Sequence, residues 1–493
     1  MKGHMHIVVI DVGTSSMRGI LYTEKAEILH VHQITYEVQY LSQNRAEQDP
    51  DDWKKALFEI GAAMAVYAEE KGITIDALSL TSQRSSVIPV DREGKPLRSA
   101  IMWLDKRNAA ICESLKPAEG EIARRTGARI NAVFSGSKMT WIHRNEPEIY
   151  NRAYRILTIA DYLSWLMTGE YKTDHTYGSR SSLMNIRTRQ WDDELLNMYE
   201  VDREKLCELI SPGDILGYTS QSFSEATGLP TGIPMISAGG DQQCAALGMG
   251  VISKGDMELT TGTGAFLIAY TDCVPENLGS EVICGAHAVR GKYVLESSML
   301  SCSSLYDWFR TQFYPNSEKY KEINHEVEES PAGAGGCIAL PYFQGRGTPD
   351  WNSSATGSFL NLTLNTRRCD MARAVLESIA CEAKSNIEVL EQYAGTARQL
   401  YISGGLTNFG VFNQMQADVY QKQLIRSENP EQTSLGGLIS ALVSLGACED
   451  YQSALAQVKE QEKTVSYEPD PERREIYENK CSIMQQLYRK LYP

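Results

Sequence analysis

Two segments half a chain apart share one pattern of apolar and polar positions. Residues 8–22 read VVIDVGTSSMRGILY and residues 257–270 read MELTTGTGAFLIAY. In each, an apolar run leads into a tip of glycine and hydroxyl residues, and a second apolar run follows. This pattern predicts two β-hairpins. Because the unit recurs, we expect two structurally related halves with a boundary near residue 246.

Other stretches predict helices that follow strands. Apolar residues recur near helical spacing over 370–393, and the segments 234–248 and 400–420 each read as a strand, a glycine-containing junction and a helix. Strands that alternate with helices are typical of α/β domains. At 493 residues the chain exceeds what one core usually supports, so we predict two domains, residues 1–246 and 247–493.

The hairpin tips have the composition of a phosphate site. Glycine lets the backbone approach a ligand closely, and threonine and serine hydroxyls add hydrogen-bond donors. A single Gly-Thr tip is equally well an ordinary turn, so it is the pair that favours a phosphate clamp. Neither GxxxxGK[ST] nor GxGxxG occurs in the sequence, which excludes a P-loop and leaves no dinucleotide fingerprint.

Asp241 stands between an apolar strand and an Ala-rich helical segment. A carboxylate at such a junction can accept a proton from an attacking hydroxyl, as phosphoryl transfer requires. On position alone, a helix N-cap is the stronger interpretation. Both roles stay open at this point.

Two further segments contain polar or small residues within apolar runs. Ser403-Gly404-Gly405 follows a strand and predicts either a platform for adenine or an ordinary βα turn. In residues 81–107, Arg84 and Trp103 interrupt strand-like stretches and could line a pocket for a hydroxylated ligand. Taken separately, a rim aromatic and a surface ion pair explain them as well.

Charge and cysteine content narrow the function classes. The formal net charge is −15 and no Lys/Arg cluster stands out, so we expect no nucleic-acid partner. No stretch predicts a membrane span or a signal peptide, which favours a cytoplasmic protein. Eleven cysteines without a C-x-x-C spacing argue against a zinc ribbon and fit a reducing compartment.

With these elements in order, the chain resembles the FGGY family of carbohydrate kinases over nearly its whole length. The first tip, DVGTSSMR at 11–18, looks like the family's first phosphate motif, and TTGTG at 260–264 looks like the second. SGGLTNFG from residue 403 resembles its adenosine motif, and GGDQQ at 239–243 places Asp241 where the family keeps its catalytic base. TSQR at 81–84, MWLDKR at 102–107 and FSGSK at 134–138 resemble its acceptor pocket.

The resemblance implies a fold of two actin-like ATPase (ribonuclease H-like) domains that flank a catalytic cleft. The N-terminal domain would bind the sugar and supply the base, and the C-terminal domain would bind the nucleotide. ATP and Mg²⁺ are the implied cofactors, with Asp11 orienting the metal through water. The implied phosphate-binding residues are Asp11, Gly13, Thr14, Ser15, Arg18, Gly262, Thr263 and Gly264. The implied acceptor residues are Arg84, Trp103, Asp105, Asp241 and Gln242, and the implied adenosine residues are Gly404, Gly405 and Asn408.

The resemblance leaves the acceptor open among small sugars and polyols. Glycerol kinases carry an acidic residue where Ser85 stands and a tyrosine where Val133 stands. Lost hydroxyl-binding groups imply a different pocket, so a ketopentose similar to xylulose or ribulose is favoured and glycerol is the alternative. An actin-like ATPase without a phosphorylated acceptor is the alternative of another class. A homodimer is allowed by these observations.

Overall fold

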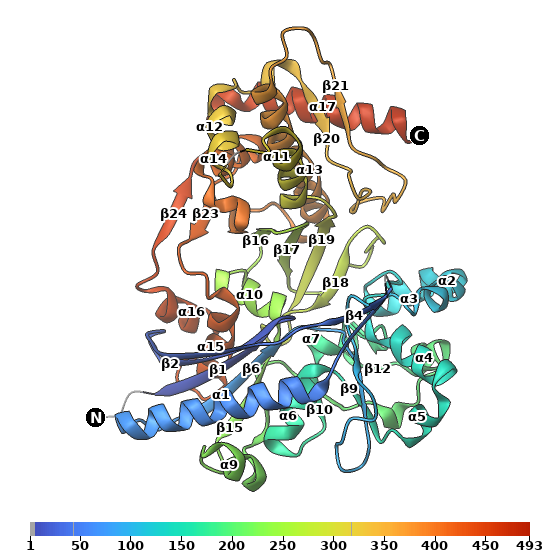
Figure 1. Cartoon of the computed structure of the whole chain (residues 1–493), viewed down its shortest axis with the longest axis vertical. Coiled ribbons are helices and arrows are strands. Elements are labelled where there is room, and N and C mark those ends of the chain that lie inside the picture. Colours follow the sequence, from blue (N-terminus) through green and yellow to red (C-terminus); the bar gives the residue numbers. More distant parts are fainter. Residues whose placement is uncertain (1–4, 43, 317) are drawn as a thin grey trace.

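The computed structural model describes residues 5–42, 44–316 and 318–493 (Figure 1). Its two large sheets lie one above the other along the long axis of the molecule, with helices packed around each. The N-terminal sheet has the strand order β14 (Ile215–Tyr218), β15 (Pro234–Gly240), β6 (Ala77–Ser82), β1 (His6–Val12), β2 (Ser16–Thr23) and β3 (Ile28–Thr35). The C-terminal sheet has the order β18 (Ile283–Ala286), β19 (Tyr293–Met299), β17 (Ala265–Thr271), β16 (Asp256–Thr261), β22 (Gln399–Gly404), β23 (Leu424–Ser427) and β24 (Thr464–Tyr467).

The predicted repeat is present in the topology of these sheets. β1, β2 and β3 form an antiparallel meander, β6 pairs in parallel with β1, and β15 pairs in parallel with β6. β16, β17 and β19 form the matching antiparallel set, β22 pairs in parallel with β16, and β23 pairs in parallel with β22. Both predicted hairpins are therefore confirmed, each at the start of its own half.

Long helices cover the sheets where the apolar spacing predicted them. The segment 370–393 lies within α13 (Arg368–Ala394), where Val375, Ile379 and Ile387 are buried. The matching connection in the first half carries α1 (Pro50–Lys71), which begins with Asp49 as N-cap and ends at Gly72 in the left-handed conformation. The core of each half thus forms between a sheet and a helix that covers it.

Two shorter helices cross where the halves meet. α10 (Asp241–Met249) and α15 (Gln432–Ser444) pack closely, and Cβ atoms on Gly248 and Gly436 would lie 1.9 and 2.0 Å from backbone oxygens of the opposite helix. α15 belongs to the second half but packs on β1, β6 and β15 of the first. Ala246 of α10 packs on apolar residues of β17 and β19. Each helix therefore joins its own half to the sheet of the other.

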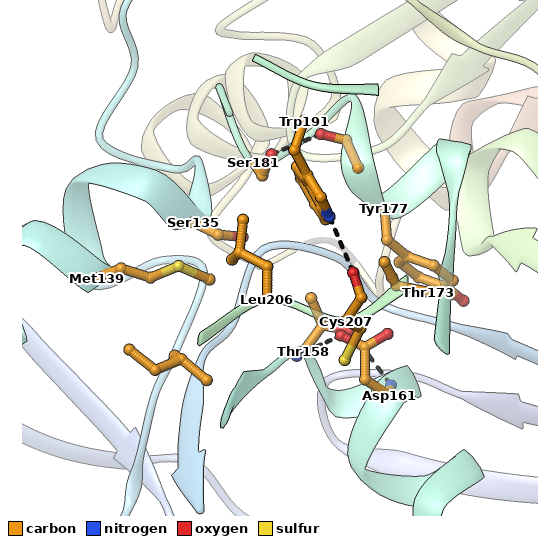
Figure 2. Close-up of a pocket in the computed structure, with 12 residues that line it drawn as sticks. Ser135, Met139, Thr158, Asp161, Thr173, Tyr177, Ser181, Trp191, Leu206 and Cys207 are labelled. Carbon is orange, nitrogen blue, oxygen red and sulfur yellow. Dashed lines mark hydrogen bonds between the residues drawn. The ribbon is translucent and has the colours of Figure 1, made fainter. Parts of the chain in front are cut away.

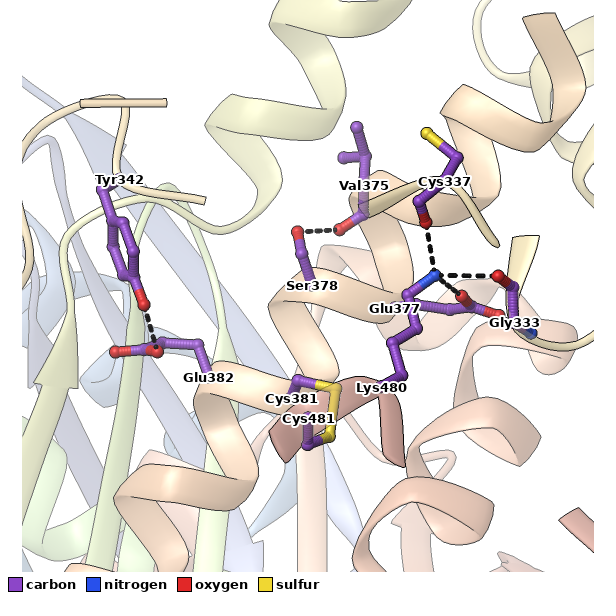
Figure 3. The surroundings of a disulfide bond; sticks show 10 residues. All are labelled: Gly333, Cys337, Tyr342, Val375, Glu377, Ser378, Cys381, Glu382, Lys480 and Cys481. Atoms are coloured by element: carbon purple, nitrogen blue, oxygen red, sulfur yellow. Dashed lines mark hydrogen bonds and ion pairs between the residues drawn. A yellow bond between two sulfur atoms is a disulfide. The ribbon is translucent and has the colours of Figure 1, made fainter. Parts of the chain in front are cut away.

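A disulfide bond links α13 to the C-terminal helix α17 (Arg474–Leu491). Figure 3 shows Cys381 and Cys481 bonded, with their Cα atoms 5.2 Å apart, and the ammonium of Lys480 between Glu377 and two backbone carbonyls. The bridge was not expected from the cysteine pattern, which favoured a reducing compartment. The two cysteines are 100 residues apart, a pairing that spacing alone does not indicate. Among the residues described, no helix is long and apolar enough to cross a membrane.

Candidate active site

Side chains from other segments hold the tip between β1 and β2 by hydrogen bonds. The carbonyl of Gly13 accepts hydrogen bonds from the Tyr36 hydroxyl at 2.8 Å and from the Gln83 amide at 3.0 Å. The Thr14 hydroxyl accepts a hydrogen bond from the indole N–H of Trp103 at 3.1 Å. Ser15 stays exposed. The structure thus connects the predicted phosphate tip to Trp103 of the predicted acceptor segment.

The tip between β16 and β17 rests on the start of α11 (Ser303–Phe313). The Thr263 carbonyl accepts hydrogen bonds from the Cys302 N–H at 2.9 Å and from the Ser304 hydroxyl at 2.8 Å. A Cβ on Gly264 would lie 2.4 Å from the Met299 carbonyl, so only glycine fits there. Thr263 itself is exposed. The sequence argument had missed Cys302 and Ser304, which carry no motif of their own.

The predicted adenosine motif begins where β22 ends. Gly404 has φ 96°, and a Cβ there would lie 2.2 Å from the Thr261 carbonyl, whereas a Cβ on Gly405 would meet nothing within 4 Å. Gly404 therefore lets the strand end pack on the phosphate hairpin, and Gly405 faces open space. Asn408 is exposed, and its side-chain oxygen accepts a hydrogen bond from Arg426 at 2.9 Å.

Asp241 is the first residue of α10. The N-cap is Gly240, and no side chain caps the helix in the usual way, although the Asp241 carboxylate accepts a hydrogen bond from the Gln242 N–H at 2.8 Å. About a third of the side chain, 36%, is accessible. The protein packed around the carboxylate raises its pKa by desolvation, and nearby Arg84 opposes this rise. An accessible carboxylate at a helix start suits both proton acceptance and a local role at the helix end.

Arg84 forms the centre of a polar cluster around Asp241. Its guanidinium lies 3.4 Å from the Asp241 carboxylate, donates to the Gln243 side chain at 3.0 Å and also contacts the Gln242 side chain. A carboxylate of the C-terminal sheet, Glu296 of β19, lies 3.9 Å from the same guanidinium. Arg84, Asp241 and Gln242 are thus brought together as predicted, while Gln243 and Glu296 were not predicted.

Comparison with known proteins decides the family. The sequence model of the FGGY family of carbohydrate kinases, N-terminal domain, matches residues 6–248, and that of the C-terminal domain matches residues 257–445. The chain belongs to the FGGY family of carbohydrate kinases. This FGGY kinase is therefore a phosphotransferase with an alcohol group as acceptor, and kinases of the family use ATP. The family assignment argues against an actin-like ATPase without a phosphorylated acceptor.

The individual relatives are named for two different activities, glycerol kinase and xylulose kinase. The FGGY kinase is 31% identical to the glycerol kinase of Thermococcus onnurineus, over 92% of this chain and 91% of the relative. It is 27% identical to the xylulose kinase of Lactococcus lactis, over 98% of this chain and 96% of the relative. The crystal structure of xylulose kinase from Rhodospirillum rubrum superposes with a TM-score of 0.93 at 24% identity, with 99% of each chain covered. That of Plasmodium falciparum glycerol kinase with ADP gives 0.89 at 25%, again with 99% covered.

Asp11, at the end of β1, lies in the electrostatic field of Asp241. Burial, and after it the negative charge of Asp241, raises the pKa of Asp11 to about 7, although Arg18 opposes the rise. Arg18 in turn pairs with Glu431, the residue before α15, at 2.7 Å. Two carboxylates that disfavour each other's ionisation form a place where a cation would be stabilised.

The residues present fit a magnesium ion held mainly by ligands from outside the protein. Among the described residues, no group of three or more His, Cys, Asp or Glu side chains is arranged to hold a metal. Mg²⁺ commonly keeps several waters and binds through one or two carboxylates together with the phosphates of a substrate. The Asp11 carboxylate, together with water and the phosphates of ATP, would match that sparse set of ligands.

Asp105, which the resemblance implied for the acceptor site, is buried and paired within its own segment. Its side chain has no exposed surface, and its carboxylate accepts hydrogen bonds from the Arg107 guanidinium at 2.9 and 2.8 Å and from the Ala46 N–H at 2.6 Å. A buried carboxylate with these partners is already satisfied. In this structure Asp105 fixes the segment that carries Trp103 and has no surface with which to contact an acceptor.

The two positions that separate this chain from glycerol kinases lie near the same wall. Ser85 is buried with φ 73°, and its hydroxyl donates to the Arg180 carbonyl at 3.4 Å. Val133 lies just before α4 (Ser135–Asn145), and its carbonyl accepts a hydrogen bond from the Lys138 ammonium. Burial lowers the pKa of Lys138 to about 7. Neither Ser85 nor Val133 offers the carboxylate or phenol of the glycerol kinase pattern.

A small enclosed cavity lies behind the Asp241 segment. It measures about 20 Å³, and its lining includes Asp161, Thr173, Tyr177 and Cys207 (Figure 2). The Tyr177 hydroxyl donates to the Gly239 carbonyl at 2.9 Å, which connects this wall to the residues before Asp241. Much of its lining is apolar, including Met139, Ile156 and Leu206. It is too small for a sugar, so the acceptor site is expected near Arg84.

Proposed function

We propose that this FGGY kinase transfers the γ-phosphate of ATP to a hydroxyl of a ketopentose or a related polyol, with Asp241 as the general base. The observation that carries the proposal is the cluster of Arg84, Asp241 and Gln242 beside Asp11 of the first phosphate tip. This arrangement brings groups that bind a hydroxylated ligand next to groups that face phosphate.

In the proposed complex the two tips bind the β- and γ-phosphates. The hydroxyls of Thr14 and Thr263 and the backbone N–H groups around Gly13, Gly262 and Gly264 donate hydrogen bonds to phosphate oxygens. Arg18 adds positive charge on the acceptor side. Mg²⁺, when bound, would neutralise charge on the phosphates, and Asp11 would help to hold it through water. The adenosine would lie against Gly405 and Asn408, which face open space.

Asp241 accepts the proton of the attacking hydroxyl as the new O–P bond forms. Its raised pKa brings the carboxylate closer to the operating pH, where a general base is most effective. In a loose transition state little activation of the nucleophile is needed, so positioning and charge neutralisation contribute more to the rate than the base does. Closure of the two domains would exclude water and limit ATP hydrolysis without transfer.

The acceptor preference rests on Ser85 and Val133. A small hydroxyl and an apolar side chain leave more room and fewer polar partners than the glycerol kinase pattern, which favours a larger acceptor than glycerol. Glycerol remains the second candidate, because a glycerol kinase is among the relatives more than 30% identical to this chain. A homodimer and a cytoplasmic location stay predictions.

A coupled assay of ADP formation over xylulose, ribulose, other ketoses, polyols and glycerol tests this preference. We expect the highest kcat/KM for a ketopentose, and fast turnover of glycerol alone would contradict it. The double variant Ser85→Glu, Val133→Tyr restores the two groups of the glycerol kinase pattern. It should shift the ratio of kcat/KM from the ketopentose toward glycerol by at least about tenfold, since unpaired polar groups discriminate strongly.

A further inference from the structure

Glu296 is an acidic side chain of the C-terminal sheet that reaches the polar cluster around Arg84. It lies on β19, and only 10% of its side chain is exposed. Its carboxylate accepts a hydrogen bond from Gln243 at 3.2 Å, lies 3.9 Å from Arg84 and forms an ion pair with Arg180. All three partners come from the N-terminal half.

The ion pair between Arg180 and Glu296 lies almost entirely inside the protein. Its guanidinium is buried, and burial lowers its pKa while the charge of Glu296 opposes that change. A buried cation without a partner is strongly unfavourable, so Arg180 needs the Glu296 carboxylate. The carbonyl of Arg180 accepts a hydrogen bond from the Ser85 hydroxyl, and its guanidinium lies 5.5 Å from the centre of the Phe134 ring. Arg180 thereby connects Glu296 to both segments that we assign to acceptor choice.

A second glutamate in the same sheet provides the contrast. Glu258 of β16 pairs with Ile268 of β17, and Ile268 pairs with Glu296 of β19, so the two glutamates lie in one cross-strand row. Glu258 is buried, and within the part of the chain that the structure describes its carboxylate has no hydrogen-bond or ion-pair partner. Burial, and after it the negative charge of Glu296, raises the pKa of Glu258 to about 8. One position of the row therefore meets two arginines, and the other meets none.

We propose that Glu296 is a positioning residue by which the C-terminal domain holds Arg84, and with it Asp241 and the acceptor, in the arrangement for transfer. The proposal rests on the function proposed above. Glu296 is a positioning residue and not a catalytic one in this proposal, because it acts through Arg84. The acceptor site is incomplete without the sheet of the nucleotide-binding half.

This arrangement links acceptor binding to the relation between the domains. If the C-terminal sheet moves away, Arg84 loses Glu296 and keeps its contacts to Asp241, Gln242 and Gln243, all at the start of α10. With Glu296 in place, the guanidinium is shared between the two halves. Acceptor that binds Arg84 in the shared position would therefore favour the state in which the domains are together.

Steady-state kinetics of Glu296→Gln test the proposal, with Glu258→Gln as the matched control. Loss of a contact to a charged group should raise the acceptor KM about 10- to 100-fold while the ATP KM stays within about twofold. Glu258→Gln replaces a buried carboxyl that is largely protonated at pH 7 and should keep both KM values. Equal changes in the two KM values of Glu296→Gln, or none, would overturn the proposal.

A second variant guards against failure to fold. Glu296→Asp keeps a negative charge for Arg180 but withdraws it by one methylene, so it should fold and show a smaller rise in acceptor KM. An acceptor KM within twofold of the wild-type value in Glu296→Asp, together with insoluble Glu296→Gln, would show a purely structural role and overturn the proposal.

The pH dependence of kcat/KM distinguishes a positioning role of Glu296 from a general loss of structure in the variant. The charged groups that act on the pKa of Asp241 are Arg84, Arg180 and Glu296, and the charge of Asp241 in turn raises the pKa of Asp11. Glu296 raises the pKa of Asp241, so Glu296→Gln should move the acid limb of kcat/KM to lower pH, and an unmoved limb would count against the proposal. Asp241→Asn distinguishes the two proposals: if it retains wild-type kcat, the assigned base is wrong, whatever Glu296→Gln does.

Discussion

The two phosphate tips have the same place in the repeated topology but different chemistry. The N-terminal tip carries a carboxylate, Asp11, and an arginine, Arg18, and it is tied through Trp103 to the acceptor side. The C-terminal tip, Gly262-Thr263-Gly264, has no charged residue and is held by backbone and hydroxyl hydrogen bonds from the start of α11. The N-terminal hairpin thus carries charged side chains, and the tip of the C-terminal hairpin carries only glycine and a hydroxyl.

The difference has an energetic consequence. Desolvation and the charge of Asp241 raise the pKa of the partly buried Asp11 to about 7, so a bound cation would stabilise its ionised form. The C-terminal tip, Gly262-Thr263-Gly264, has no carboxylate whose ionisation is disfavoured in this way. We therefore expect substitutions in the first tip to affect catalysis and pH dependence, and substitutions in the second to affect packing and nucleotide affinity.

The largest expected difference is between Asp11→Asn and Thr263→Ala. Loss of the carboxylate that orients the metal should lower kcat about 10²- to 10³-fold, as for other groups that stabilise charge in a transition state. Loss of one threonine hydroxyl should cost about 2- to 10-fold, mainly in the ATP KM. Steady-state kinetics at saturating Mg²⁺ measure both, and equal losses in the two variants would contradict the division between the tips.

The two glycines of the adenosine motif offer a sharper test of packing. Gly404→Ala forces a Cβ to within 2.2 Å of the Thr261 carbonyl at φ 96°, so it should destabilise the protein by about 2–4 kcal/mol. Gly405→Ala adds a methyl group in open space and should leave the melting temperature unchanged. If adenosine lies on Gly405, this variant still raises the ATP KM. Thermal melts measure the stability of both variants, and ATP titration measures their KM for ATP. Similar melting temperatures for the two variants would contradict the packing role of Gly404.

The smallest expected effect is on stability without ligands. The pKa of Asp11 is about 7 in the folded protein and about 3.8 in the unfolded chain, so the folded state binds the extra proton between these values. Stability from this group is therefore complete below about pH 4 and falls as pH rises to about 7. Asp11→Asn removes this loss and should melt at least about 2 °C above wild type at pH 8, with no gain near pH 4. A melting temperature of Asp11→Asn below that of wild type at pH 8 would contradict this prediction.

Local patterns were enough to predict much of this molecule. Both hairpins and the helix over residues 370–393 follow from short-range apolar spacing, and the motifs that carry the family resemblance lie in order along the chain. The position of Asp241 at a strand–helix junction was also predictable, and the structure adds that Gly240 is the N-cap.

The remainder depends on contacts between distant segments. Glu296 and Arg180 have no motif, and only the meeting of the two sheets brings them to Arg84. The crossing of α10 and α15 and the Cys381–Cys481 disulfide are likewise long-range. Asp105 was expected in the acceptor site because it lies in a motif, yet its neighbour Arg107 folds back on it. Sequence spacing does not show which way a side chain points.

The central claim is that Asp241 transfers a proton during phosphorylation of a bound acceptor. The most direct measurement is acceptor-dependent ADP formation by Asp241→Asn, with the binding of ATP measured in the same preparation. We predict that kcat falls about 10²- to 10⁴-fold while the Kd for ATP stays within about twofold of wild type. Turnover of the acceptor at near wild-type kcat would contradict the account.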